Sequence, residues 1–404
     1  MRDVAIIGAG MIQFGRRDED GLMDMLAYAS LNALDDAGQV MGTAVGTADK
    51  PVDAVYVATM GAGILQHQTA VASALVDRLS LLPAAADTVE NGPASGGSAV
   101  KNGLLAVASG YYDTVLVVGG EKMREVTGWR ATDFVATLTH PEAEYIYGVT
   151  LPGMAGMFTR LYMEKYGVTR EQLVQVAIKN QKMGALNPYA HVEMVITQEG
   201  IFDSPHSVVN NPPVADPLHL YDACPVSDGA AAVVICPLDM VKNAKKPPIL
   251  IAGFGQATDT HTLQEREDPT DLRAVRLASQ QAFEMAKAKP SDIDVAELHD
   301  AFTILEIAES EHVGFFKKGE GGKAAAAGKT QLGGTIPINV SGGLKARGHP
   351  VGATGVAQVA EIVWQLRREV GKERQVKNAK TGLTVNFGGF GNNVLAFVLR
   401  RVDQ

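Results

Sequence analysis

The most constraining feature of this 404-residue chain is an internal duplication, because one order of apolar and amphipathic segments occurs twice. Apolar, strand-like runs alternate with segments whose apolar residues recur at helical spacing. In the first half these segments are residues 4–7, 22–37, 52–59, 94–109 and 114–118. Their counterparts in the second half are residues 249–253, 274–288, 293–298, 352–367 and 383–385. The chain therefore predicts an α/β fold of two βαβαβ halves, with a mainly parallel sheet covered by helices on both faces.

One long segment has no counterpart in the second half. Residues 121–216 are rich in Met, Tyr and Pro, and we expect them to form an inserted loop domain. The predicted N-terminal half then comprises residues 1–120 together with 217–243, and the predicted C-terminal half comprises residues 244–404. The lysine- and proline-bearing residues 242–248 are the expected link between the halves.

Composition excludes several classes of function. A net charge of −9 argues against a nucleic-acid partner, because no basic surface is available for phosphates. No apolar run is long enough to span a membrane, and the opening run is too short for a signal peptide, so we expect a cytoplasmic protein. Cys224 and Cys236 are too few for a disulfide framework and lack zinc-site spacing, so we expect buried structural thiols and no metal site.

Three segments carry residues typical of catalytic loops. They are Gly92-Pro93-Ala94-Ser95-Gly96, His299-Asp300-Ala301-Phe302, and residues 339–355 with Gly348-His349-Pro350. Together they resemble the thiolase superfamily, and within it the branch with a His-Asp-Ala-Phe motif, which includes sterol-carrier-type and archaeal acetoacetyl-CoA thiolases. Further similarity in residues 184–190 and 222–232 extends the resemblance over nearly the whole chain.

The resemblance implies a thiolase fold, with the duplicated halves forming a five-layer αβαβα core and the inserted loop domain covering a coenzyme A site. It implies a coenzyme A thioester as substrate or ligand, with no covalently bound cofactor. It also implies a homodimer or homotetramer. An active thiolase-like chain or a small zinc-ribbon/OB acyl-CoA-binding protein is a further expected partner.

The chain departs from this family at two catalytic positions. The resemblance places a nucleophilic cysteine where Pro93 stands, activated by the histidine that corresponds to His349. Proline removes the sulfur and also the backbone N–H that helps to hold the thioester oxyanion. Counting back from Gly388 places Val385 where the family has its second acid/base. Ordinary covalent thiolysis is therefore not expected.

The remaining candidates form an oxyanion site. By the resemblance, His299 and His349 point at the thioester oxygen that becomes an enolate oxygen. Ser95 is either a substitute nucleophile or a residue that caps and packs the helix start. Asn386 is either a pocket amide or a turn residue, and Gly388 is a further pocket candidate.

Three functions remain open at this stage. The first is cleavage or formation of a C–C bond next to a coenzyme A thioester, by retro-aldol or decarboxylation chemistry, through an enolate site of His299 and His349. The second is a catalytically silent, thiolase-like subunit of a heteromeric acyltransferase complex. The third is an acetyl-CoA acyltransferase with an unusual nucleophile, with Ser95 as its candidate.

Overall fold

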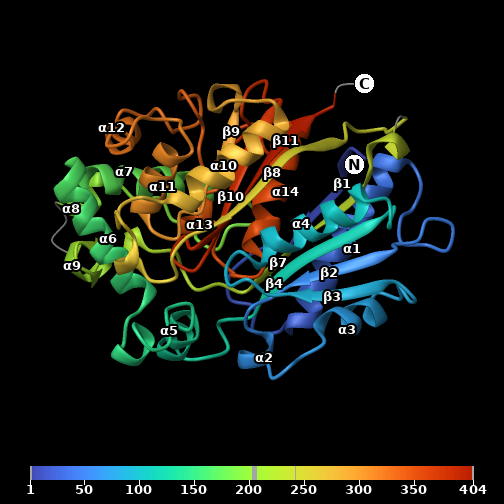
Figure 1. Ribbon diagram of the computed structural model, residues 1–404, viewed down its shortest axis with the longest axis horizontal. Coiled ribbons are helices and arrows are strands. Elements are labelled where there is room, and N and C mark those ends of the chain that lie inside the picture. Colours follow the sequence, from blue (N-terminus) through green and yellow to red (C-terminus); the bar gives the residue numbers. More distant parts are fainter. Residues whose placement is uncertain (1, 203–206, 242, 403–404) are drawn as a thin grey trace.

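The computed structural model describes residues 2–202, 207–241 and 243–402, and nine of its strands form one long sheet (Figure 1). The strand order is β3-β2-β4-β7-β1-β8-β11-β10-β9. The first half-sheet consists of β1 (Val4–Met11), β2 (Ala54–Ala58), β3 (Ala85–Val89), β4 (Val115–Glu121) and β7 (Gly229–Pro237). The second half-sheet consists of β8 (Ile249–Thr258), β9 (Val295–Glu297), β10 (Thr381–Gly388) and β11 (Asn393–Arg401). The two half-sheets meet through β1 and β8, which pair only at Ala5 with Leu250 and Ile6 with Ile249.

The prediction of a mainly parallel sheet is wrong. Only β2 with β3, β2 with β4 and β9 with β10 pair in parallel, whereas β7 and β11 run antiparallel to both of their neighbours. Every residue of β7 is buried, so its sequence is apolar throughout. A strand covered on both faces shows no alternation of polar and apolar residues, so its sequence does not distinguish parallel from antiparallel pairing.

The helices complete five layers, as the resemblance implies. On the outer face of the first half-sheet lie α1 (Leu22–Met41) and α3 (Val71–Arg78), and on the outer face of the second lie α10 (Arg273–Ala286) and α11 (Thr303–His312). Between the half-sheets, α4 (Ser95–Ala108) packs against α14 (Thr354–Arg367) in one shared core (Figure 1). Because α4 belongs to the first half and α14 to the second, this middle layer joins the duplicated units.

The described residues between 122 and 228 build most of the remaining structure. Its longer helices are α5 (Gly128–Ala136), α6 (Leu151–Tyr166) and α7 (Arg170–Gly184), followed by the short α8 (Gln198–Phe202) and α9 (Ser207–Asn210) and the pair β5 (Pro213–Ala215) and β6 (Leu218–His219). The Thr169 hydroxyl caps α7 by accepting from the Gln172 N–H. Helix α7 packs against α11, α12 (Gly321–Ala326) and α13 (Gly343–Ala346), which anchors this segment to the second half.

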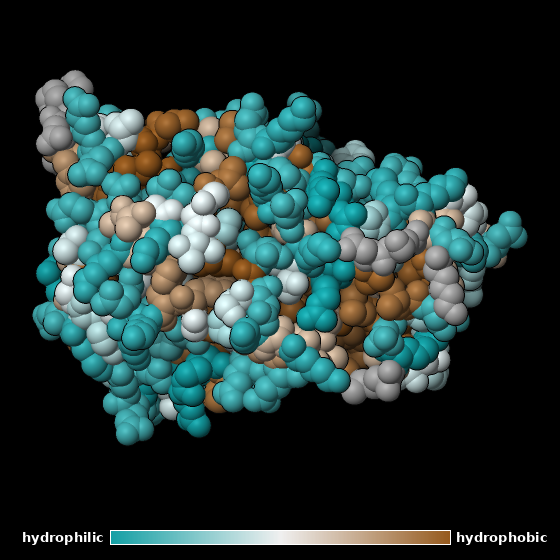
Figure 2. Space-filling view, turned by 90° about the horizontal axis from the view of Figure 1, so that it is seen from above, coloured by the Kyte–Doolittle hydropathy of each residue, from teal (hydrophilic) through white to brown (hydrophobic). Residues whose placement is uncertain are grey.

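The other short elements connect these layers. They are α2 (Ala62–Leu65) and the 3-10 helices η1 (Tyr145–Tyr147), η2 (Leu220–Asp222), η3 (Leu238–Val241), η4 (Leu263–Glu265) and η5 (Pro290–Asp292). The link predicted at residues 242–248 falls between η3 and β8, and its Lys242 lies outside the described residues. Within the described ranges, no helix is both long and apolar enough to cross a membrane. The face of the molecule in Figure 2 is largely hydrophilic, with apolar side chains showing between polar ones.

Glycine permits an unusually close contact between α4 and α14. A Cβ at Gly355 would lie 2.2 Å from the Gly97 nitrogen, and a Cβ at Gly96 would lie 2.9 Å from the Gly355 nitrogen. Both neighbours are backbone atoms that cannot move aside. The first turns of the two helices therefore touch, and the loops that precede them lie side by side.

We predict that Gly355→Ala destabilises the protein by about 3 kcal/mol, the upper part of the usual cost of overpacking, because the new Cβ meets backbone that must shift. Urea unfolding measures the effect. The matched control is Gly63→Ala, since Gly63 is exposed, lies in a helix and has open space around its Cα. Equal stability of the two variants would contradict the importance of the helix contact.

Candidate functional site

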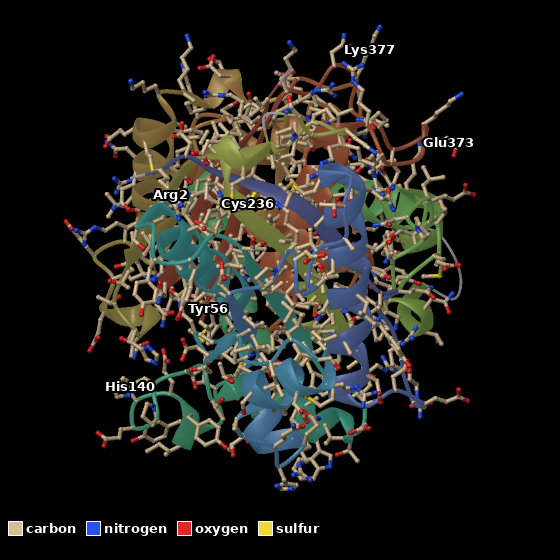
Figure 3. The ribbon with its side chains drawn as sticks, turned by 90° about the vertical axis from the view of Figure 1, so that its right-hand side faces the viewer. Arg2, Tyr56, His140, Cys236, Glu373 and Lys377 are labelled. Atoms are coloured by element: carbon tan, nitrogen blue, oxygen red, sulfur yellow. The ribbon has the colours of Figure 1, made fainter. Side chains whose placement is uncertain are left out.

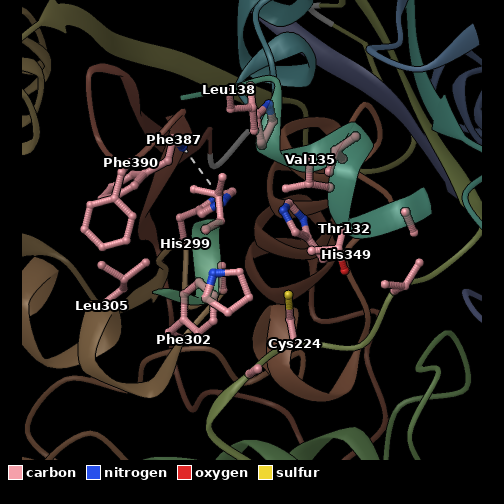
Figure 4. A pocket seen from close by; sticks show the side chains of 18 of the residues that line it. Thr132, Val135, Leu138, Cys224, His299, Phe302, Leu305, His349, Phe387 and Phe390 are labelled. Carbon is pink, nitrogen blue, oxygen red and sulfur yellow. Dashed lines mark hydrogen bonds between the residues drawn. The ribbon is translucent and has the colours of Figure 1, made fainter. Parts of the chain in front are cut away.

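A largely apolar cavity lies where the loops before α4, α11 and α14 meet the end of β10 (Figure 4). Its empty volume is about 840 Å³, including the solvent at its mouth. Its lining includes Pro93, Thr132, Val135, Leu138, Cys224, Val226, His299, Ala301, Phe302, Leu305, His349, Phe387, Gly389 and Phe390. The cavity thus brings together Pro93 from the first half with His299 and His349 from the second, as the motifs predict.

His299 is held in a single neutral tautomer. Its Nδ1 lies 3.3 Å from the Asn386 Nδ2 and 3.4 Å from the backbone nitrogen of Phe387. A backbone N–H only donates, so Nδ1 accepts and is unprotonated. Burial, and then the neighbouring His349 and Arg347, lower the pKa of His299 well below its usual range. The ring is therefore neutral, and its single N–H is on Nε2.

Asn386 fixes this arrangement from behind His299. Its Oδ1 accepts from the Gly97 N–H at 3.1 Å, so the orientation of the amide is set by a backbone donor. Its NH₂ then donates to the Pro93 carbonyl oxygen at 3.1 Å as well as to His299. One side chain on β10 therefore ties together the first turn of α4, the Pro93 loop and the tautomer of His299.

His349 is supported in both neutral tautomers. Its Nδ1 lies 2.6 Å from the Thr354 hydroxyl oxygen, and that hydroxyl is also 3.0 Å from the Pro350 carbonyl oxygen. The Pro350 oxygen already accepts from the N–H groups of Ala353 and Thr354. The hydroxyl is thus free to donate to either partner, and the proton of the His349 ring can reside on Nδ1 or Nε2. Burial, followed by the charge of Arg347, lowers the pKa of His349 to about 3.

The two imidazoles meet edge to face. Their ring centroids are 5.0 Å apart with planes at 87°, and Phe387 stacks on His299 at 5.3 Å (Figure 4). Both histidines are almost fully buried. In such an environment, the N–H groups of two neutral imidazoles interact more strongly with a negative charge that develops beside them than they would in water, because little solvent screens the interaction.

Buried polar groups hold the His299 loop in place. The His299 N–H donates to the Glu309 carboxyl at 2.9 Å, and burial raises the pKa of Glu309 well above its usual range. The Asp300 carboxyl accepts from the Asn180 amide and from the Leu344 N–H, both at 2.7 Å. Burial raises the pKa of Asp300 to about 7. These carboxyl groups point away from the cavity and serve to position the loop.

Several predicted site residues lie outside the cavity lining. Ser95 is fully buried, donates to the Gly92 carbonyl oxygen at 2.6 Å and accepts from the Asn91 N–H at 2.8 Å, so its hydroxyl holds the turn. Gly388 lines a separate, more polar pocket. Val385, expected at an acid/base position, is buried in the core between the second half-sheet and its outer helices. Successive strand residues face opposite sides, so it is Asn386 that reaches the Pro93 loop.

The expectation that both cysteines are buried structural thiols holds only for Cys236, which is enclosed on β7 (Figure 3). Cys224 is half-buried, and its sulfur points into the cavity (Figure 4). Burial raises the pKa of Cys224 to about 12, so the thiol stays protonated at neutral pH. The sequence missed this residue because nothing in its motif shows which way the side chain points. Within the described residues, no group of three or more His, Cys, Asp or Glu side chains is arranged to hold a metal ion.

Similarity to known proteins extends over nearly the whole length of this chain. The chain matches the family model described as "Thiolase, N-terminal domain" at residues 4–239 and the one described as "Thiolase C-terminal domain-like" at residues 255–401. An acetyl-CoA acetyltransferase of Methanothermobacter thermautotrophicus is 44% identical over 401 residues, which cover 99% of this chain and 100% of that protein. Sterol carrier protein 2 of Oryctolagus cuniculus is 32% identical, over 95% of this chain and 70% of that protein. A solved structure described as "Ltp2-ChsH2(DUF35) aldolase" has a TM-score of 0.80 and 25% identity, over 99% of this chain and 98% of its own.

We predict that His349 makes stability fall at acidic pH. The unfolded chain takes up a proton on this histidine near pH 6.5, whereas the folded protein does so only near pH 3. Stability from this group is therefore complete above pH 6.5 and declines as the pH falls toward 3. Between pH 7 and 5, the loss amounts to about 2 kcal/mol.

The measurement is urea unfolding of the wild type and of His349→Gln at pH 7, 6 and 5. The variant lacks the titrating group. As the pH falls, the unfolding free energy of the wild type should therefore decrease more than that of the variant. A difference between the two proteins that stays constant over this range would show that His349 is not held neutral.

Proposed function

Because this chain belongs to the thiolase superfamily, we propose that it binds a coenzyme A thioester and acts on the carbon–carbon bond next to the thioester carbonyl through an enolate, without an acyl-enzyme. The thiolase fold predicted from the motifs is confirmed by the matches to both family models. The observation that carries the proposal is the fixed Nε2–H of His299 beside His349, in a cavity whose nucleophile position holds Pro93.

The proposed step needs only a stabilised enolate. In retro-aldol cleavage, the β-hydroxyl loses its proton, the Cα–Cβ bond breaks and the β-carbon becomes a carbonyl. The electron pair of the broken bond passes to Cα and the thioester oxygen, and protonation of Cα then yields an acyl-CoA. In decarboxylation, CO₂ leaves in place of the carbonyl compound. A preorganised donor at the enolate oxygen supplies about 3 kcal/mol of transition-state stabilisation.

The described cavity lining offers no activated nucleophile. Pro93 has neither sulfur nor hydroxyl, the Ser95 hydroxyl is buried in the turn, and the Cys224 thiol is protonated at neutral pH. These observations favour a non-covalent reaction over an acetyl-CoA acyltransferase with an unusual nucleophile.

The two histidines take different roles in this proposal. His299 donates its Nε2–H to the enolate oxygen, since its tautomer is fixed. His349, supported in both tautomers, accepts the β-hydroxyl proton on Nε2 while Thr354 accepts from Nδ1. Its low pKa makes it a weak base in the empty site, but negative charge developing on the enolate raises the affinity of the ring for a proton.

Of the two reactions we favour retro-aldol cleavage. One solved structure that this chain resembles over its full length is described as an aldolase. The test is incubation with a 3-hydroxyacyl-CoA and mass spectrometry of the products. We expect a shortened acyl-CoA and a carbonyl compound in equal amounts, reduced at least about 100-fold in rate by His299→Ala. Turnover that survives His299→Ala, or no turnover in any form of the protein, would contradict the proposal.

A second candidate is a subunit of a larger assembly. Among the described residues, the titratable groups that line the cavity are His299, His349 and Cys224, and none of them is a carboxylate or an amine. A partner is therefore one source of an additional base. The aldolase named above is described together with ChsH2(DUF35), which supports a heteromeric assembly, besides the homodimer or homotetramer that the family suggests. Activity that appears only after a co-purified polypeptide is added back would favour this candidate.

We predict that Pro93→Cys restores covalent chemistry. The new thiol would line the cavity beside His349, at the position that the resemblance assigns to the nucleophile. After incubation with acetyl-CoA, intact-mass spectrometry should show one added acetyl group on the variant and none on the wild type. An acetylated wild type would overturn the non-covalent proposal, and an unmodified variant would contradict the assignment of position 93.

We predict that Asn386→Asp reduces retro-aldol turnover by about 100-fold, because the isosteric carboxylate accepts where the amide donated. The carboxylate accepts more strongly than the Phe387 N–H donates at 3.4 Å, so the Nδ1 of His299 takes the proton and Nε2 loses it. Ring ¹⁵N chemical shifts report this tautomer change directly, which a merely structural defect would not produce. Asn378→Asp, the same change at an exposed residue, is the control. Unaltered turnover in Asn386→Asp would contradict the role of the fixed tautomer.

A further inference from the structure

Cys224 is a third titratable side chain of the cavity, and the roles proposed for the two histidines leave it unused. It belongs to a short segment whose backbone and side chains are bonded to the loops of both histidines. The Cys224 N–H donates to the carbonyl oxygen of Ala301, two residues after His299, at 2.9 Å. In the same segment, the Ser227 hydroxyl oxygen accepts from the His349 N–H at 3.3 Å. The segment therefore fixes Cys224 relative to both histidines.

The Cys224 sulfur points into the cavity, toward the space beside His349 (Figure 4). Within the part of the chain that the structure describes, this sulfur has no hydrogen-bond partner, and the Nε2 atoms of His299 and His349 have none either. These two histidines are only 3% and 9% exposed. Buried polar groups without a partner in the protein indicate a ligand that supplies one. The thiol and the two rings therefore face the same bound molecule.

A buried ammonium group lies behind this thiol. Lys345 of α13 is only 1% exposed, and its Nζ donates to the carbonyl oxygen of Ala223, the residue before Cys224, at 2.5 Å. Burial raises the pKa of Cys224 to about 12, and the positive charge of Lys345 acts in the opposite direction. Cys224 can therefore give up its proton to a strong base without leaving an isolated charge in the protein interior.

Retro-aldol cleavage requires proton transfers at two different atoms. His349 takes the proton of the β-hydroxyl, and the α-carbon of the enolate must gain one. An enolate carbon is a much stronger base than a thiolate, so a thiol with a raised pKa still protonates it. Since His299 donates to the enolate oxygen, Cys224 is the remaining titratable group among the described residues of the lining.

We propose, on the basis of the function proposed above, that Cys224 is the catalytic acid that protonates the α-carbon of the enolate, and that Lys345 stabilises the thiolate that remains. The S–H bond breaks as the Cα–H bond forms, which yields the acyl-CoA. The proton that His349 took from the β-hydroxyl then returns to the thiolate. Both side chains regain their starting forms, and the cycle consumes no further reactant.

The test is deuterium incorporation at the α-carbon of acetyl-CoA in D₂O, measured by mass spectrometry. This exchange is the same proton transfer in reverse, so it needs the same group at Cα. We expect Cys224→Ala to lower the enzymatic exchange rate at least about 100-fold. Cys236→Ala, the same change at the enclosed cysteine of β7, should leave the rate unchanged.

Calorimetry separates a catalytic role of Cys224 from a packing role. The wild type, Cys224→Ala and Cys236→Ala should bind acetyl-CoA with the same affinity, because the proposed proton transfer follows binding. Exchange that persists in Cys224→Ala would overturn the proposal. Exchange and affinity that fall by the same factor would overturn it as well.

Lys345→Met tests the counter-charge. Only the thiolate reacts with iodoacetamide, so the alkylation rate of Cys224 at pH 8 reports how readily the thiol ionises. Loss of the ammonium group should slow this alkylation by about 10-fold. Lys182→Met, at an exposed lysine of α7, is the matched control and should keep the wild-type rate. Equal rates in the wild type and in Lys345→Met would contradict the role of Lys345.

The outcome is separable from that of the proposed function. Exchange that is lost in His299→Ala but persists in Cys224→Ala would retain the enolate site and reject Cys224 as the acid. Exchange that is lost in Cys224→Ala but persists in His299→Ala would do the reverse. No exchange in the wild type, with any co-purified partner present, would reject both.

Discussion

The backbone contact between the first turns of α4 and α14 is the constraint on which the site depends. Gly96, Gly97 and Gly355 leave no side chain between the helices, so one helix from each half begins at the same place. The loops that precede them carry Pro93 and His349, which thereby line one cavity. Helix N-termini carry partial positive charge, so this meeting point also favours a negative oxyanion and disfavours protonated histidine.

From that contact a short chain of hydrogen bonds sets the tautomer of His299. The Gly97 N–H orients the Asn386 amide, and the amide with the Phe387 N–H makes the Nδ1 of His299 an acceptor. His349 has no such constraint, because its partner is the hydroxyl of Thr354. The two histidines therefore differ in kind despite their similar burial. One is a fixed donor and the other is able to exchange a proton, which is the division of roles that the proposed enolate formation requires.

Periodicity predicted the duplication and its helices, and the family resemblance implied the layered core and the common site of Pro93, His299 and His349. The sequence did not predict the antiparallel β7 and β11, since a fully buried strand has no directional pattern. The error at Val385 arose because a shift of one residue along a strand moves a side chain to the opposite face. The tautomer of His299 and the direction of the Cys224 sulfur depend on tertiary contacts that no local pattern encodes.

The structure supports formation of an enolate by a protein that has no nucleophile at position 93. Hydrogen exchange at the α-carbon of an acyl-CoA in D₂O tests this proposal most directly. Mass spectrometry of hexanoyl-CoA incubated with the wild type should show deuterium at Cα, and His299→Ala and His349→Ala should each abolish the excess over the uncatalysed rate. Exchange that persists in both variants, or no exchange even with any co-purified partner present, would contradict an enolate site built by these two histidines.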